Sequence, residues 1–140
     1  MSGFRNITLD VETGNGADDV LLEPLVFDRL DGSTVRAPIG GTTDGLSTPK
    51  IIRILPGYDS TGDDWFSGVL HDSAYRNQLQ VFCPVTQEWP LASLGRRQSD
   101  LLILEAMKRQ GVGWTRRTVI YAALRLFGWI AFKQDRRGLK

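Results

Sequence analysis

Residues 68–75, with the sequence GVLHDSAY, contain His71, the only histidine of the chain. They lie in a segment whose apolar side chains recur at spacings of three and four residues, which is typical of an amphipathic helix. The sequence therefore predicts a helix that begins near Asp63 or Asp64 and continues to about Gln78.

Two further helices are predicted after this one. The second runs from about Ser93 to Gln110, and Gly111 is placed to end it. The third begins near Thr115 and carries apolar residues at helical spacing. We expect a shared buried core among the three helices, formed by Val69, Leu70, Ile103, Leu104, Ile120, Leu126 and Phe127.

The chain before the first helix has the pattern of strands and turns. Residues 7–11 alternate apolar and polar side chains, and residues 20–30 form a broken apolar run. Asp31-Gly32 predicts a hairpin turn before a strand at residues 34–36. The glycine-rich residues 40–45 are predicted to form a loop.

These elements predict an α+β fold, in which a small N-terminal antiparallel β-sheet is followed by a three-helix core. The 140 residues, 41% of them hydrophobic and 24% charged, suit one compact domain. Within residues 1–140 we expect a strand-rich front at 1–41, a loop plus three-helix core at 42–132, and a basic tail at 133–140.

Cys83 is the only cysteine, so the chain has no internal disulfide and no cysteine-rich zinc site. No apolar run approaches the roughly 20 residues that span a bilayer. The first residues lack the apolar core of a secretory signal. We therefore expect synthesis and folding in a reducing cytoplasm.

The net charge of +1 conceals an uneven distribution. Residues 1–90 contain 6 Lys and Arg against 13 Asp and Glu, whereas residues 91–140 contain 11 against 3. A basic C-terminal third either contacts phosphates, an anionic membrane or an acidic surface, or simply forms a solvated face.

His71 is the leading candidate for a general base, because imidazole titrates near neutral pH. Asp72 points about 100° away from it on a helix, so the two side chains cannot pair directly. Tyr75 lies one turn further along and can reach Asp72 at a spacing of three residues.

Asp100 lies on an otherwise apolar stripe of the second predicted helix. A carboxylate in such a place is costly unless it is paired. Its partner is either His71, whose tautomer it would fix, or one of Arg96 and Arg97 one turn earlier.

The loop at residues 40–49 contains Asp44 among glycines. A carboxylate and backbone carbonyls are the hard oxygen ligands that calcium prefers, and Asp72 would complete such a site from the helix. Asp-Gly is also the commonest kind of turn dipeptide, so an ordinary turn is the alternative.

Five runs of residues together resemble an uncharacterised phage protein family (domain of unknown function 1353). They occur in order over about residues 20–132: 43–49 (TDGLSTP), 68–75 (GVLHDSAY), 97–100 (RQSD), 105–107 (EAM) and 121–129 (YAALRLFGW). This resemblance implies a protein encoded by a tailed bacteriophage.

The helical half also resembles bacterial secreted phospholipase A2 over about residues 42–128. That family has an Asp-containing calcium loop, a His-Asp helix followed by Tyr-Arg-Asn, and a second helix with an Asp. A helix from Tyr to Phe-Gly then closes the domain. The corresponding residues here are Asp44, the run 71–77, Asp100 and the run 121–128.

The phospholipase A2 resemblance implies roles for these residues. His71 would remove a proton from water, Asp100 would orient its imidazole, and Tyr75 would belong to the same catalytic group. A calcium ion would be held by Asp44, Gly45, Leu46 and Asp72.

Three functions remain open at this point. The first is a calcium-dependent acyl-ester hydrolase that acts on lipid or the bacterial envelope. The second is a non-catalytic virion component, such as a tail, baseplate or neck protein, that reuses the fold and contacts other phage virion proteins. The third is a metal-dependent hydrolase of cell-wall peptide, for which one histidine is few ligands. Nucleic acid is not an expected partner.

Overall fold

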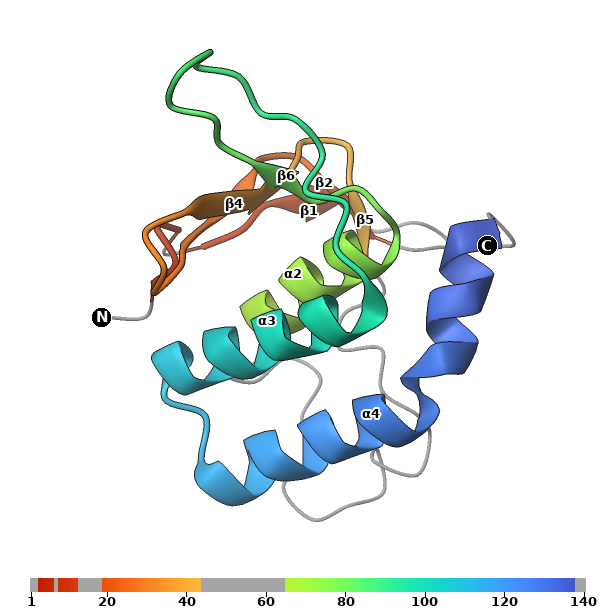
Figure 1. Ribbon diagram of the computed structural model, residues 1–140. Coiled ribbons are helices and arrows are strands. Elements are labelled where there is room, and N and C mark those ends of the chain that lie inside the picture. Colours follow the sequence, from red (N-terminus) through yellow and green to blue (C-terminus); the bar gives the residue numbers. More distant parts are fainter. Residues whose placement is uncertain (1–2, 7, 13–18, 44–64, 138–140) are drawn as a thin grey trace.

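The computed structural model describes residues 3–6, 8–12, 19–43 and 65–137 (Figure 1). The elements are β1 (Val11–Glu12), β2 (Asp19–Leu21), β3 (Leu25–Asp28), β4 (Thr34–Ala37), β5 (Thr42–Thr43), α2 (Trp65–Tyr75), β6 (Gln80–Val81), α3 (Arg96–Gln110) and α4 (Trp114–Arg137). The predicted α+β class is confirmed, and among the described elements every strand except β6 precedes the helices.

The strands form two small antiparallel sheets, with the orders β1-β2-β5 and β3-β4-β6. β3 and β4 make the predicted hairpin, in which Asp28 lies opposite Thr34 and Gly32 turns the chain with φ of +90°. Only glycine adopts such a φ without strain, so the Asp-Gly dipeptide forms the turn.

Two strands lie where the sequence predicts no strand. Thr42 and Thr43 belong to the predicted loop but form β5, which pairs with β2. Gln80 and Val81 follow α2 and form β6, which pairs with β4. Strands of two residues are too short to show a period in sequence, and these two exist because a neighbouring strand offers hydrogen bonds.

α2 occupies the centre of the molecule. Figure 1 shows the sheets on one side of α2 and α4 on the other, with α3 alongside, and α2 contacts β4, β5, α3 and α4. Every residue from Ser67 to Tyr75 is buried. The helix that carries His71 is therefore surrounded by both halves of the structure.

α3 begins and ends close to the predicted positions. Gly111 follows it in the left-handed conformation with φ of 81°, and the N–H of Val112 donates to the carbonyl of Met107 over 3.0 Å. This is the glycine-terminated helix end that the sequence predicts.

α4 is longer than predicted and is bent (Figure 1). It spans 24 residues and continues to Arg137, so most of the predicted basic tail is helix. Among the described residues, no helix is both long and apolar enough to cross a membrane.

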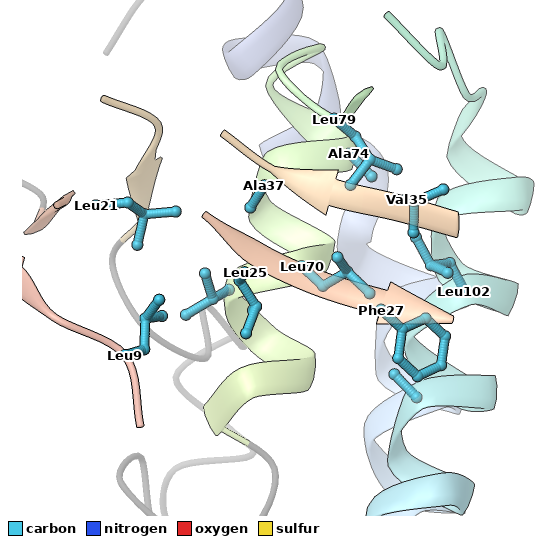
Figure 2. Packing of buried hydrophobic residues seen from close by; sticks show 12 residues of the cluster. Leu9, Leu21, Leu25, Phe27, Val35, Ala37, Leu70, Ala74, Leu79 and Leu102 are labelled. Carbon is cyan, nitrogen blue, oxygen red and sulfur yellow. The ribbon is translucent and has the colours of Figure 1, made fainter. Parts of the chain in front are cut away.

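The buried apolar side chains form two clusters. The larger one joins both sheets, α2 and one face of α3, and Figure 2 shows Leu25 and Phe27 of β3 beside Leu70 of α2. Its members are Leu9, Leu21, Leu25, Phe27, Val35, Ala37, Val69, Leu70, Ala74, Leu79, Leu102 and Ala106. The smaller one joins the opposite face of α3 to α4: Ile103, Met107, Val112, Ile120, Ala123 and Leu124. α3 therefore separates two cores where the sequence predicts one.

The predicted helical core is partly wrong. Leu126 and Phe127 are exposed and Leu104 is only partly buried, whereas Ile120 and Leu124 carry the contact of α4 with α3. α4 is apolar around most of its circumference, so the spacing of its apolar residues does not determine which side faces α3.

Candidate functional site

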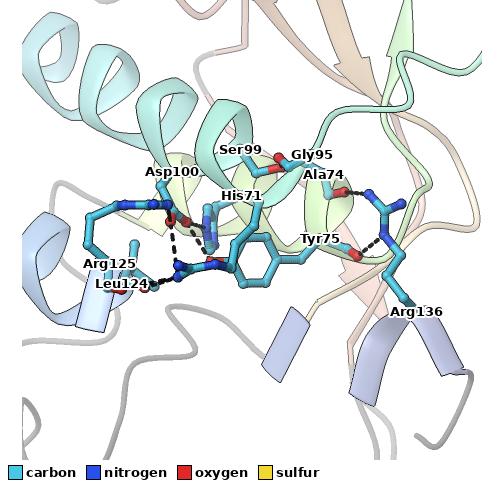
Figure 3. Close-up of polar contacts among 10 residues, drawn as sticks. His71, Ala74, Tyr75, Gly95, Ser99, Asp100, Leu124, Arg125 and Arg136 are labelled. Atoms are coloured by element: carbon cyan, nitrogen blue, oxygen red, sulfur yellow. Dashed lines mark hydrogen bonds and ion pairs between the residues drawn. The ribbon is translucent and has the colours of Figure 1, made fainter. Parts of the chain in front are cut away.

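The structure places His71 against Asp100, where α2 packs on α3. His71 Nε2 lies 3.0 Å from Asp100 Oδ1, and Figure 3 shows this contact within a cluster of polar side chains. His71 is 4% exposed and Asp100 is 0% exposed. The predicted pairing of the two side chains is confirmed, and their catalytic roles stay predictions.

This contact determines the tautomer of the imidazole. An ionised carboxylate only accepts hydrogen bonds, so Nε2 of His71 carries the hydrogen and donates it to Asp100. In the neutral ring Nδ1 then holds the lone pair. Among the described residues, no hydrogen bond reaches Nδ1. The imidazole is thus oriented as a base.

Tyr75 completes the contact between α2 and α3. Its hydroxyl donates to Asp100 Oδ1 over 2.5 Å, and its ring centroid lies 4.0 Å from that of His71. Burial, together with the neighbouring Asp100 carboxylate, raises the pKa of Tyr75. Tyr75 therefore stays a hydrogen-bond donor, and it contacts Asp100 and not Asp72.

Two arginines neutralise the buried carboxylate. Arg125 Nη1 lies 2.8 Å from Asp100 Oδ2, and Arg96 Nη1 lies 3.8 Å from the same oxygen. Burial would raise the pKa of Asp100, but the hydrogen bonds from His71, Tyr75 and Arg125 outweigh it and hold that pKa below its ordinary value. Asp100 therefore remains ionised near neutral pH.

Of the partners that the sequence offers for Asp100, His71 and Arg96 both contact it. Arg97 is exposed and does not pair with Asp100. Sequence reasoning missed Arg125. Its signal was available, because Arg125 is the only charged residue between positions 118 and 132. A single charge in an apolar helix indicates a buried partner.

α4 approaches Tyr75 through a glycine. A Cβ atom at Gly128 would lie 2.6 Å from the Tyr75 hydroxyl, closer than any real Cβ contact. Further along the helix, Arg136 donates to the carbonyls of Tyr75, Ala74 and Leu94 over 2.9, 3.3 and 2.6 Å. Arg136 therefore binds the carbonyl end of α2, where cations are favoured.

Asp72 faces a different element from His71. Thr43 Oγ1, on β5, donates to Asp72 Oδ2 over 2.7 Å, and Asp72 is buried. Thr42 is held alongside, because its hydroxyl accepts from Arg76 Nη1 over 2.8 Å and its N–H donates to Gln78 Oε1 over 3.1 Å. β5 is thus attached to α2 directly before the predicted calcium loop.

The predicted calcium ligands Asp44, Gly45 and Leu46 lie outside the described residues. The described residues contain no group of three His, Cys, Asp or Glu side chains that could hold a metal ion. Of the four predicted ligands, Asp72 alone can be located, so convergence of Asp72 with Asp44 stays a prediction.

The fold and the site define an α+β protein in which buried His, Asp and Tyr side chains and two partly exposed arginines connect three helices. The chain belongs to a family of proteins of unknown function (DUF1353), whose sequence profile matches residues 20–124. No curated protein and no solved structure matches this chain.

Proposed function

We propose that this protein is a phage-encoded acyl-ester hydrolase of the phospholipase A2 type, with His71 as its general base. The observation that supports the proposal is the contact of His71 Nε2 with Asp100 Oδ1 at 3.0 Å. It holds the ring in the tautomer whose Nδ1 accepts a proton, and it places a carboxylate where an imidazolium would form.

In the proposed reaction, His71 carries the proton through both steps of ester hydrolysis. Nδ1 of His71 takes a proton from water while the water oxygen bonds to the ester carbonyl carbon. The same proton then passes to the departing alkoxide as the acyl C–O bond breaks, which leaves a carboxylic acid and an alcohol. Asp100 stabilises the imidazolium, and Tyr75 and Arg125 hold Asp100 in place.

Calcium is part of this proposal. Thr43 and Asp72 provide oxygen atoms, which are the ligands that calcium prefers. Calcium takes 6–8 oxygen ligands, so further ligands are needed. The ligands would be the Asp72 carboxylate together with Asp44 and the carbonyls of Gly45 and Leu46. Bound calcium would supply positive charge next to the ester carbonyl oxygen.

Titration calorimetry with calcium tests these ligands. We expect Asp72→Asn to bind calcium more weakly than the wild type, and Asp10→Asn, which removes an exposed carboxylate elsewhere, to bind it equally. Equal affinity in the wild type and Asp72→Asn would show that Asp72 is not a ligand.

The proposed activity is tested by fatty-acid release from phospholipid and by hydrolysis of a water-soluble short-chain ester. His71→Asn should reduce both rates about 10²–10⁴-fold, the usual contribution of general-base catalysis. Circular dichroism and melting temperature establish whether the variant is folded.

A second candidate is a structural virion protein that keeps the cluster for stability. The observation in its favour is burial, because His71 is 4% exposed and Asp100 is surrounded by His71, Tyr75, Arg96 and Arg125. A wild type without ester hydrolysis, combined with a large loss of stability in His71→Asn, would favour this candidate.

Both candidates predict contacts with a phage particle or the host envelope. The protein would be made in the host cytoplasm, and the structural candidate requires it in the particle beside other virion proteins. Mass spectrometry of purified particles measures this directly, and absence from the particles would exclude the structural candidate.

A further inference from the structure

α4 presents a large apolar surface to solvent. It carries half of the large hydrophobic side chains that are exposed among the described residues: Trp114, Val119, Leu126, Phe127, Trp129 and Ile130. Exposed apolar side chains that are scattered singly are ordinary, but a concentration of them on one element marks an interaction site.

Five of the exposed positions form a continuous stripe, which we call the outer face of α4. It consists of Val119, Ala122, Leu126, Trp129 and Ile130, whose spacings of three and four residues place them on one side of the helix. Leu126 is 66% exposed and Trp129 is 48% exposed.

The opposite side of α4 packs against the rest of the protein. Ile120, Ala123 and Leu124 pack against α3, and Gly128 lies against Tyr75. In Figure 1, α4 lies on the side of α2 away from the sheets. The outer face is therefore not needed for the internal core.

The charge around this face indicates the chemistry of its partner. Residues 114–137, which form α4, contain six Lys and Arg against one acidic residue, Asp135, and Lys133 lies on the outer face. Two copies joined through this face would bring two basic segments together, which is unfavourable. An anionic partner would instead be attracted.

Trp129 and Lys133 favour a lipid surface as that partner. Lys133 is exposed, and its Nζ lies 5.5 Å from the centre of the Trp129 ring, one turn away on the same face. At membrane interfaces tryptophan takes the headgroup level, and lysine buries its carbon stem while its ammonium contacts lipid phosphate.

We propose that the outer face of α4 binds an anionic lipid surface, with Leu126, Trp129 and Ile130 among the acyl chains and Lys133 at the phosphates. This binding does not depend on ester hydrolysis by His71. It would be reversible and salt-dependent, because one helix face and a few cations provide it.

Sedimentation with vesicles tests the proposal. The full chain is mixed with vesicles of phosphatidylcholine alone or of phosphatidylcholine with phosphatidylglycerol. We expect binding to the anionic vesicles that weakens with salt, and much less binding to the neutral ones. The double variant Leu126→Ser/Trp129→Ser should bind the anionic vesicles about a hundredfold more weakly, because each inserted side chain contributes about a factor of ten and the two factors multiply.

Leu30→Ser is the matched control, since Leu30 is 75% exposed but lies in the β3–β4 turn. It should bind like the wild type. Lys133→Gln should weaken binding and reduce its salt dependence. Circular dichroism establishes that each variant keeps its helices, which we expect because the replaced side chains are outside the core.

Three outcomes would overturn the proposal. They are no binding to anionic vesicles, equal binding by the double variant, and a wild-type dimer that the double variant abolishes in analytical ultracentrifugation. The last outcome would assign the face to a second copy of the chain. His71→Asn should bind vesicles normally, so loss of the proposed hydrolysis and loss of lipid binding are distinguishable.

Discussion

At the scale of single residues, the main feature is the charge on Asp100 inside the protein. Burial of an unpaired carboxylate would be prohibitive, and four side chains from three helices compensate for it. The cluster therefore stabilises the packing of α2, α3 and α4 against one another, whether or not His71 acts as a base.

Asp100→Asn should lower the free energy of unfolding by about 3 kcal/mol, because it leaves Arg125 and Arg96 without their buried partner. Urea denaturation near neutral pH measures this. Arg97→Gln, which removes an exposed arginine from the same turn of α3, is the control and should change stability by less than about 0.5 kcal/mol. Equal stability of all three proteins would contradict the role of Asp100.

The same carboxylate predicts a pH dependence. The pKa of Asp100 in the folded protein lies below its ordinary value of 3.8, so the unfolded state binds more protons. The stabilisation is present above that value and is lost as pH falls through the lower, folded pKa. Between about pH 6 and pH 3, the wild type should lose more unfolding free energy than Asp100→Asn. Parallel pH curves for the two proteins would contradict this prediction.

Gly128→Ala should destabilise the protein by about 1–3 kcal/mol, although alanine favours helices, because its Cβ would overlap the Tyr75 hydroxyl. Tyr75→Phe removes that oxygen, and the next Tyr75 atom is at an ordinary distance of 3.6 Å. In the Tyr75→Phe background the glycine substitution should therefore be nearly neutral. Thermal unfolding of the four proteins of this cycle measures the coupling, and additive effects would disprove the contact.

At the scale of secondary-structure elements, α3 is the helix on which both cores depend. Leu102 and Ala106 belong to the core with the sheets, whereas Ile103 and Met107 belong to the core with α4. Adjacent positions of one helix thus pack against different layers, so the buried apolar residues of α3 are not confined to the stripe that carries Asp100.

Leu102→Ala should cost about 2–5 kcal/mol, the usual range for a leucine removed from a packed core. Leu101→Ala, its exposed neighbour in α3, should cost less than about 1 kcal/mol. Chemical denaturation of both variants compares the two faces directly. Similar losses in the two variants would show that the faces of α3 are assigned wrongly.

At the scale of the whole molecule, the strand-rich front and the helical part are joined by strand pairing and by a shared core. β6 follows α2 in sequence but pairs with β4 of the front, and α3 contributes to both cores. The strand-rich front therefore cannot separate from the helices without exposing the larger core.

We expect a single cooperative unfolding transition for this reason. Far-ultraviolet circular dichroism reports mainly the helices, and tryptophan fluorescence includes Trp89, whose ring centre lies 4.2 Å from the Arg36 guanidinium of β4 and so reports the packing of the front. The two signals should give the same midpoint in urea. Separate midpoints would show that the front and the helical half unfold independently.

Local sequence was sufficient for the elements that local interactions determine. The Asp31-Gly32 hairpin, the end of α3 at Gly111 and the three helices depend on turn geometry and on periods within short stretches. The pairing of His71 with Asp100 was also predictable, because a lone histidine and a carboxylate on an apolar stripe each require a partner.

Only the tertiary structure decided which face of α4 is buried, and with it the positions of Arg125, Gly128 and Arg136 around α2. It also decided that β5 and β6 are strands. The physical reason is the same in each case. A helix that is apolar on most sides, and strands of two residues, have no strong preference of their own, so contacts with distant parts of the chain determine their orientation and pairing.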